Sequence, residues 1–371
     1  MKKFVKLSLV AAVAVAGLTT ANAKPLEEAI KGVDVTGTVA YRYEEASRAS
    51  ATVPGNEEST NNYNAVIDMS VPAGDDLAMG LSFQANGMGL DNTSAAAGGT
   101  AAKVQLTGAN FTYTGVANTS ITAGLQAIPT PWTVAADPMG TIHAGTGILA
   151  VSTFAPVTLV GAYFNDTDIS DLNNANNSQD IAVAGAILNI AGVNAEIMYA
   201  DARDVLDSYT LAAGYKLDLD GVKVGLSARY TELQFDGLTT DNDTVQGKIT
   251  VAAGMFDAMV AYGENGSQGG KVAFDGTAKT TMEGWNVHLY GAGADAEYLK
   301  LSAGMKVLPS LHVSLNYNDL DTTANANDAS ETYVQVKYQA SKSLSTYVRL
   351  GQNEINNQDS DAGRLHIQYS F

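Results

Sequence analysis

The sequence predicts an all-β protein, a transmembrane antiparallel β-barrel of about 18 strands. Three observations predict it: an export segment at the start, apolar residues that alternate with period two along most of the remaining chain, and no later apolar stretch near the ~20 residues of a transmembrane helix. The 371 residues include no Cys, which excludes disulfides and thiolate metal sites. The net charge of −18 repels phosphate, so we expect no nucleic-acid partner.

Residues 1–23 have the composition of a secretory signal peptide. Three lysines precede an apolar run over residues 7–18, which is too short to cross a ~30 Å hydrocarbon core as a helix. A small-x-small pattern ends at Ala23, so we expect cleavage between Ala23 and Lys24. Cleavage removes three Lys and no acid, which changes the net charge from −18 to −21. Residues 24–371 should form a single barrel domain.

The strands are predicted from alternation. Val39 and Tyr41 fall on one face of the first segment, while Ala40 and Arg42 fall on the other. The same period recurs at 77–83, 222–230, 311–317 and 365–371. Aromatic residues gather near strand ends, and the second face is small or polar. This favours a barrel in lipid over a soluble β-sandwich, whose second layer would be apolar.

Connections between the alternating segments are short and long in turn. Short turns fall at 72–76, 219–221, 308–310 and 340–342. Long polar stretches fall near 44–62, 86–102, 127–146, 165–179, 233–243, 264–294, 319–330 and 353–361. Short turns at one rim and long extracellular loops at the other are typical of outer-membrane barrels. Counting hairpins gives about 18 strands, with 16 as the alternative. Trp285–Tyr290 also alternates, but an added strand would make the number odd, so we assign it to a loop.

The chain ends in an amphipathic strand that includes Tyr369 and finishes at Phe371. An open sheet edge in lipid leaves unpaired backbone groups, so this strand should pair with the first. A terminal aromatic residue on such a strand resembles the sorting signal of bacterial outer-membrane proteins. We therefore expect insertion into the outer membrane of a Gram-negative bacterium by the barrel-assembly machinery, with outer-membrane lipid and lipopolysaccharide as the surroundings.

Several stretches carry a family resemblance: Pro25 to Val35, Tyr41 to Tyr43, and Gly145 to Gly147, with a similar strand–turn–strand layout over 297–320. They resemble the major outer-membrane porin family of Campylobacter and related bacteria. The resemblance implies an 18-stranded homotrimeric porin, a water-filled channel for passive diffusion of ions and small hydrophilic solutes. It also implies that the third long loop folds into the pore.

Strand parity sorts the charged residues of the wall. Our candidates for the pore lining are the cations Arg42, Arg229, Lys248, Arg349 and Arg364 and the carboxylates Asp68 and Glu196. The larger set of inward charges makes the wall slightly basic. Arg42 and Arg229 are the wall candidates at the constriction, although the same arginines could simply pair with Asp68 or Glu196 in a hydrated lumen.

The third long loop, 127–146, is expected to narrow the pore. Two prolines stiffen its start before Trp132, because each fixes φ near −65°. Asp137 is its only carboxylate. A carboxylate opposite an arginine wall would create a transverse field that orients dipolar solutes.

Most of the acidic residues lie in the long connections, whereas the wall favours anions. An acidic mouth concentrates cations within a Debye length of ~8 Å. Because the mouth carries more charge, and the family resemblance leans the same way, we expect a weak cation preference. The alternative is a surface-exposed structural or adhesin barrel with a plugged lumen, which small lumen-facing residues such as Ala78, Gly80 and Ser82 disfavour.

The sequence contains no complete catalytic or metal-binding motif. The four His have no zinc-site spacing, and no Gly-x-Ser-x-Gly elbow is present. Residues 166–171 imitate the first EF-hand ligands but lack the Gly and the closing Glu. We therefore expect no enzyme activity, no cofactor and no metal.

Overall fold

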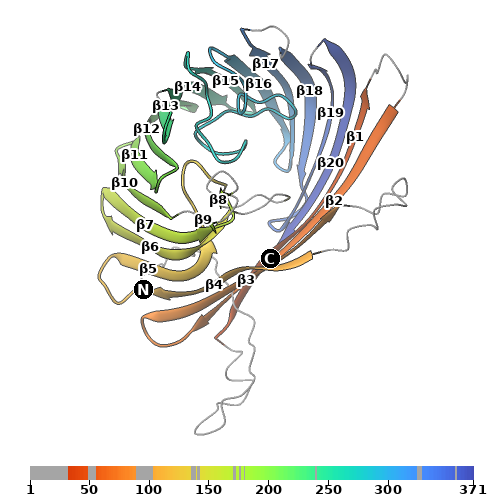
Figure 1. Cartoon of the computed structure of the whole chain (residues 1–371). Coiled ribbons are helices and arrows are strands. Elements are labelled where there is room, and N and C mark those ends of the chain that lie inside the picture. The colour runs from red at the N-terminus through yellow and green to blue at the C-terminus, as the bar shows by residue number, and fades with distance from the viewer. Residues whose placement is uncertain are drawn as a thin grey trace, which may run out of the picture.

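The computed structural model describes residues 32–48, 56–88, 103–134, 139, 143–169, 173–174, 177–178, 180–238, 240–323, 328–355 and 357–371. An 18-stranded antiparallel sheet closes on itself into a barrel (Figure 1). Its strands are β1 (Asp34–Arg48), β2 (Asn56–Pro72), β3 (Leu77–Met88), β4 (Lys103–Tyr113), β5 (Thr119–Ala127), β6 (Ala144–Phe154), β7 (Val157–Thr167), β10 (Ile181–Ile190), β11 (Val193–Ala202), β12 (Leu206–Leu219), β13 (Val222–Phe235), β14 (Asp241–Ala253), β15 (Phe256–Asn265), β16 (Glu297–Leu308), β17 (Leu311–Asp321), β18 (Ala329–Gln339), β19 (Leu344–Ile355) and β20 (Gln358–Ser370).

A separate two-stranded sheet, β8 (Asn173–Asn174) with β9 (Asn177–Ser178), lies in the connection between β7 and β10. Within the described ranges, no helix has the length and apolar character needed to span a bilayer.

The first and last strands close the barrel. Arg42 of β1 lies opposite His366 of β20, and the pairing continues to Thr38 opposite Ser370. Beyond it, Gly37 N donates to Phe371 O at 3.0 Å and Phe371 N donates to Gly37 O at 3.1 Å. The expected closure and the expected 18 strands are confirmed, and the alternative of 16 strands is wrong.

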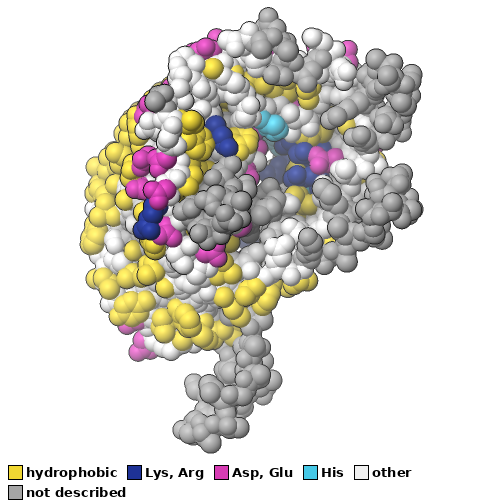
Figure 2. Space-filling model, viewed as in Figure 1, with side chains coloured by type: hydrophobic (Ala, Val, Ile, Leu, Met, Phe, Trp, Pro, Cys, Tyr) yellow, Lys and Arg dark blue, Asp and Glu magenta, His cyan; other side chains and the backbone are white. Residues whose placement is uncertain are grey.

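The two faces of each strand differ as the alternation predicts. Val39 and Ile67 are outward and exposed at 51% and 42%, while Ala40 and Asn64 point inward and are exposed at 1% and 2%. Figure 2 shows hydrophobic side chains over the outer surface and Lys and Arg side chains inside the opening. The large outward side chains are exposed because the surrounding medium of such a face is hydrocarbon.

Tight turns occupy one rim. Asp220 and Gly221 join β12 to β13 with φ values of 50° and 92°, the left-handed pair that a type I′ hairpin requires. This backbone twist matches that of the strands on either side, which allows the register of β12 and β13 to continue to Leu219 and Val222.

Several connections at the opposite rim are shorter than predicted. Residues 233–235 and 241–243 pair within β12, β13 and β14, and only residues 236–240 join β13 to β14. Likewise, β19 and β20 pair as far as Ile355 and Gln358. Acidic residues assigned to loops, among them Glu44, Asp241 and Asp359, therefore lie on strand ends. Polar composition concealed these ends, because hydrogen bonding between strands continues beyond the apolar band.

The connection between β15 and β16, residues 266–296, lies inside the ring of strands (Figure 1). Val287 and Leu289 are 1% and 0% exposed and pack against Tyr298, which is also buried. The segment Trp285–Tyr290 forms no barrel strand; an isolated bridge joins Glu283 to His288. The assignment of this stretch to a loop is confirmed.

Candidate functional site

Two connections meet inside the barrel. Trp132, after β5, is fully buried, and its carbonyl oxygen accepts the backbone N–H of Phe274 at 2.9 Å. Both side chains belong to one apolar cluster with Phe164, Ile181 and Met198 of the barrel wall. Because these wall residues are inward-facing, segments 128–134 and 270–278 both narrow the lumen.

Local hydrogen bonds shape the first of these segments. Thr133 Oγ1 donates to the carbonyl oxygen of Ile128 and accepts the backbone N–H of Thr130 at 3.1 Å. A hydroxyl that bonds nearby backbone groups in this way stabilises a turn. The turn directs Trp132 into the apolar cluster instead of towards solvent.

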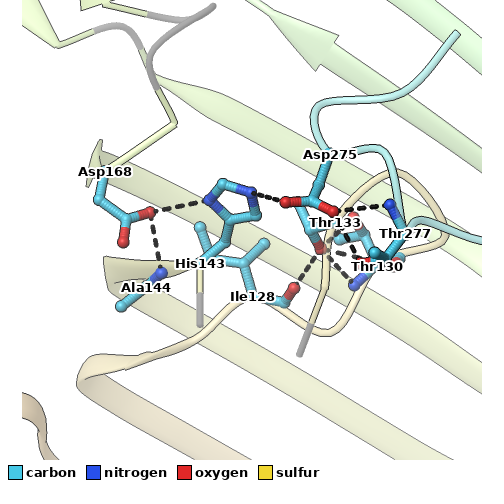
Figure 3. A network of polar contacts seen from close by, with 8 residues as sticks. All are labelled: Ile128, Thr130, Thr133, His143, Ala144, Asp168, Asp275 and Thr277. Atoms are coloured by element: carbon cyan, nitrogen blue, oxygen red, sulfur yellow. Dashed lines mark hydrogen bonds and ion pairs between the residues drawn. The ribbon is translucent and has the colours of Figure 1, made fainter. Parts of the chain in front are cut away.

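His143 joins three connections (Figure 3). Its Nδ1 lies 3.3 Å from Asp168 Oδ1, after β7, and its Nε2 lies 3.8 Å from Asp275 Oδ2, in segment 266–296. Asp168 Oδ1 also accepts the backbone N–H of Ala144 at 3.0 Å, and Asp275 Oδ1 accepts that of Thr277 at 2.7 Å. The imidazole thus bridges two carboxylates that are each fixed by a backbone group.

Glu331 of β18 anchors the tip of segment 266–296, Trp285 and Asn286, to the wall. Its side chain accepts the backbone N–H of Trp285 at 2.5 Å and that of Asn286 at 2.7 Å. Asn318 Nδ2 donates to the same carboxylate at 2.6 Å. A buried charge is costly unless it is hydrogen-bonded, and here three N–H groups satisfy Glu331.

Cations of the wall hold the same tip from another side. The guanidinium carbons of Arg349 and Arg364 lie 5.9 and 5.4 Å from the centroid of the Trp285 ring. Arg364 Nε donates to Glu44 Oε1 at 2.6 Å, which orients the guanidinium over the ring. Cation–π contacts of this kind contribute about 0.5–2 kcal/mol each, depending on desolvation.

A second charged group lies on β11 to β16. Arg229 Nη2 is 2.8 Å from Glu196 Oε1, and Arg229 Nη1 donates to Thr210 Oγ1 at 2.9 Å. Lys248 and Lys300 both lie opposite Ala261 of β15, one on each neighbouring strand. Lys300 Nζ donates to the carbonyl oxygen of Glu283 at 2.5 Å, which fixes segment 266–296 on this wall as well.

The structure brings some of the predicted site residues together and separates others. Glu196 and Arg229 form an ion pair, and Arg349 and Arg364 lie opposite one another on β19 and β20. Asp68 lies opposite Thr36, whereas Arg42 lies opposite Asn62, so these two do not pair. Trp132 lies in the inward segment 128–134, and Lys248 faces the lumen. Asp137, Ala23 and Lys24 lie outside the described residues.

Strand parity missed the residues that position the second inward connection. Glu331 is assigned to the lumen by parity, but nothing in its own strand indicates that its partner is the backbone at Trp285. One signal was present: the chain has two Trp, Trp132 and Trp285, and both fall in polar connections. A large aromatic side chain in such a stretch indicates a segment that packs inward.

One histidine in the connection 266–296, His288, has a shifted pKa. Burial lowers the pKa of His288, with the nearby charges of Lys300 and Arg364 acting in the same direction and Glu331 opposing them. The imidazole is therefore held in its neutral form. In the part of the chain that the structure describes, no group of three or more His, Asp or Glu is arranged to hold a metal.

A closed antiparallel barrel with an apolar outer face, and a charged lumen narrowed by inward connections, is the architecture of an outer-membrane porin. Residues 1–234, more than half of the chain, match the family model of the Campylobacter major outer membrane protein, and the chain belongs to this family. It is an outer-membrane porin that forms a channel for small solutes. No curated protein matches the chain significantly.

Solved structures share the fold at low sequence identity. OpdL of Pseudomonas aeruginosa is 16% identical, with a TM-score of 0.75 over 92% of this chain and 99% of that one. A BenF-like porin from Pseudomonas fluorescens Pf-5 is 15% identical, with a TM-score of 0.75 over 92% and 99%. OccAB1 of Acinetobacter baumannii is 15% identical, with a TM-score of 0.71 over 91% and 96%.

Proposed function

We propose that the porin passes ions and small hydrophilic solutes by passive diffusion with a weak cation preference, and that it performs no covalent chemistry and needs no cofactor. The observation that carries the proposal is a lumen lined with charged side chains and narrowed by two connections that are fixed to its wall. Such a passage selects solutes by size and charge without tight binding.

The cation preference is supported by acids at the rim that carries the inward connections. Strand ends there include Glu44, Glu45, Asp241, Asp243, Asp319, Asp321, Asp359 and Asp361. Their combined charge concentrates cations at the mouth within a Debye length of ~8 Å. The wall inside is basic, which limits the preference to a weak one.

The conduction path is proposed to run past Asp137, Arg42, Asp68, Glu196, Arg229, Lys248, Arg349 and Arg364. The inward direction of the described members supports this role. Trp132, expected from the sequence to line the constriction, is instead buried in the apolar cluster and supports the connection from behind. Arg229 is proposed to act at the constriction together with Glu196, with which it forms an ion pair.

For biogenesis, we propose export by a signal peptide over residues 1–23, with cleavage between Ala23 and Lys24, and a mature single domain of residues 24–371. Phe371 and Tyr369 would form the sorting signal for the barrel-assembly machinery. Their rings stack at 6.1 Å on the closing strand, which supports a role in final closure. We also propose a homotrimer, in contact with lipopolysaccharide, in the outer membrane of a Gram-negative bacterium.

Planar-bilayer recording of the purified, detergent-folded protein tests the proposal. We expect stepwise conductance at low voltage and, in a salt gradient, a reversal potential on the cation side. Silence would instead support the second candidate, a structural or adhesin barrel, which the packing of two connections inside the lumen favours. A reversal potential on the anion side would contradict the cation preference alone.

A further inference from the structure

A cavity of about 480 Å³ lies between the connection 266–296 and the barrel wall. Residues 277–283 form one side of it, and residues of β11 to β16 form the other. Volumes of a few hundred Å³ are typical of sites for small molecules. This cavity lies within the lumen, where a passing solute would reach it.

The charges around the cavity are unequal. The cations that line it are Arg229, Lys248, Lys279 and Lys300, and the only lining carboxylate is Glu283. Glu196 pairs with Arg229, and Lys300 donates to the Glu283 carbonyl oxygen, so two cations are already engaged. Among the described residues, neither Lys248 nor Lys279 has an ion-pair partner, and both side chains are exposed to the lumen.

A buried hydroxyl also lacks a partner there. Thr281 lines the cavity, is 6% exposed, and its Oγ1 makes no hydrogen bond in the structure. A buried donor without an acceptor is unfavourable, and a ligand oxygen that reaches this hydroxyl would accept the missing hydrogen bond. Gln246 Nε2 donates to the Lys279 carbonyl oxygen at 3.2 Å, so the segment that presents Lys279 and Thr281 is held against β14.

We propose that this cavity is a binding site for small oxyanions of charge −2 or −3, such as di- and tricarboxylates or phosphate. Lys248 and Lys279 supply charge-assisted hydrogen bonds, Thr281 supplies a neutral one, and Arg229 adds to the positive potential. The proposal rests on the proposed channel function and deepens it. A porin that admits cations more readily at its mouth holds multivalent anions inside, with a weak affinity that permits release.

Single-channel recording with citrate or inorganic phosphate as probes tests the site. Added to the wild-type barrel, each probe is expected to interrupt the current transiently. The double variant Lys248→Gln/Lys279→Gln should shorten the mean blockade of either probe by about tenfold, since hydrogen bonds from charged donors are stronger than neutral ones. Thr281→Val, which keeps the side-chain shape, should shorten it by a few-fold.

Lys337→Gln is the matched control. Lys337 faces the lumen on β18, opposite His312, and lies outside the cavity. It should leave the blockades unchanged, and a loss equal to that of the double variant would overturn the site in favour of general lumen charge. Wild-type conductance without any blockade would overturn the site and leave the channel function intact. Absence of conductance would overturn the channel function itself. Blockade by citrate but not phosphate would assign the site to carboxylates, and the reverse to phosphate.

Discussion

At the residue scale, two acidic side chains of the lumen differ in what they do. Glu331 is 3% exposed and has its oxygens committed to the N–H groups of Trp285, Asn286 and Asn318. Glu196 has the wall cation Arg229 as its partner. The first carboxylate therefore fixes a connection to the wall, whereas the second pairs with a charged side chain of the wall itself.

Glu331→Ala should release the tip of the inward connection. Three donors then lose their acceptor inside the protein, at a cost of about 1–3 kcal/mol for each one left buried. We expect larger and noisier single-channel conductance, with the barrel still folded, because the pairing of β17, β18 and β19 is unaffected. Glu354→Ala, at an exposed position of β19, is the control. Conductance unchanged in Glu331→Ala would show that the tip is held without this carboxylate.

Glu196→Gln should move ion preference towards anions. Removing the carboxylate leaves the Arg229 guanidinium uncompensated in the lumen, with Lys248 nearby on the cavity wall. We expect the cation-to-anion permeability ratio, from reversal potentials, to fall by about twofold. Asp218→Asn, at the rim with tight turns, removes the same charge far from the Arg229–Glu196 pair. If both variants shift the ratio equally, net charge and not this pair sets the preference.

At the element scale, the connection 266–296 is fixed inside the lumen by contacts with several elements. It is fixed to the wall by Glu331, by Lys300 and by the Arg349–Trp285–Arg364 contacts, and to the other inward connection at Trp132. Contacts at both sides of the barrel limit its movement. Its docking should nevertheless depend on pH through His288.

The lowered pKa of His288 determines whether docking strengthens or weakens as the pH falls. Undocked, the imidazole titrates near pH 6.5, whereas docked it titrates lower because of burial. Below about pH 6.5 the undocked state binds more protons, so docking weakens as pH falls through the lowered pKa. We expect current fluctuations of the wild type to increase from pH 7 to pH 5, and His288→Gln to remove most of this increase. An increase of equal size in His288→Gln would show that other groups cause it.

At the scale of the whole molecule, the sequence predicts best those features that contact with lipid requires, namely the direction of side chains and the closure of the barrel. Alternation predicted the inward direction of Arg42 and Arg229 and the closing strand at Phe371, because apolar side chains must face hydrocarbon. Short and long connections in turn predicted the number of strands, because short turns gather at one rim and long loops at the other. The contacts of Glu331 with Trp285 and of His143 with Asp275 were not predictable. They join residues from distant parts of the chain, and a polar connection in a water-filled lumen follows no periodic pattern.

Closure of the barrel at Gly37 provides the last prediction. Gly37 has no side chain where the Phe371 ring lies: a Cβ there would approach that ring to 2.6 Å and the Val66 carbonyl oxygen to 2.5 Å. An aromatic side chain that covers a strand glycine stabilises sheet pairing, so the terminal ring is packed on the seam between first and last strands.

Gly37→Ala should destabilise the folded barrel by about 1–3 kcal/mol, the usual cost of overpacking, whereas Gly161→Ala is the matched control. Gly161 also lies on a barrel strand, β7, but an added Cβ there meets nothing within 4 Å. Urea unfolding in detergent, followed by the shift in electrophoretic mobility of the heated protein, measures both. Equal stability of the two variants would mean that the Phe371 ring moves aside freely, and that closure depends on the backbone bonds between Gly37 and Phe371 alone.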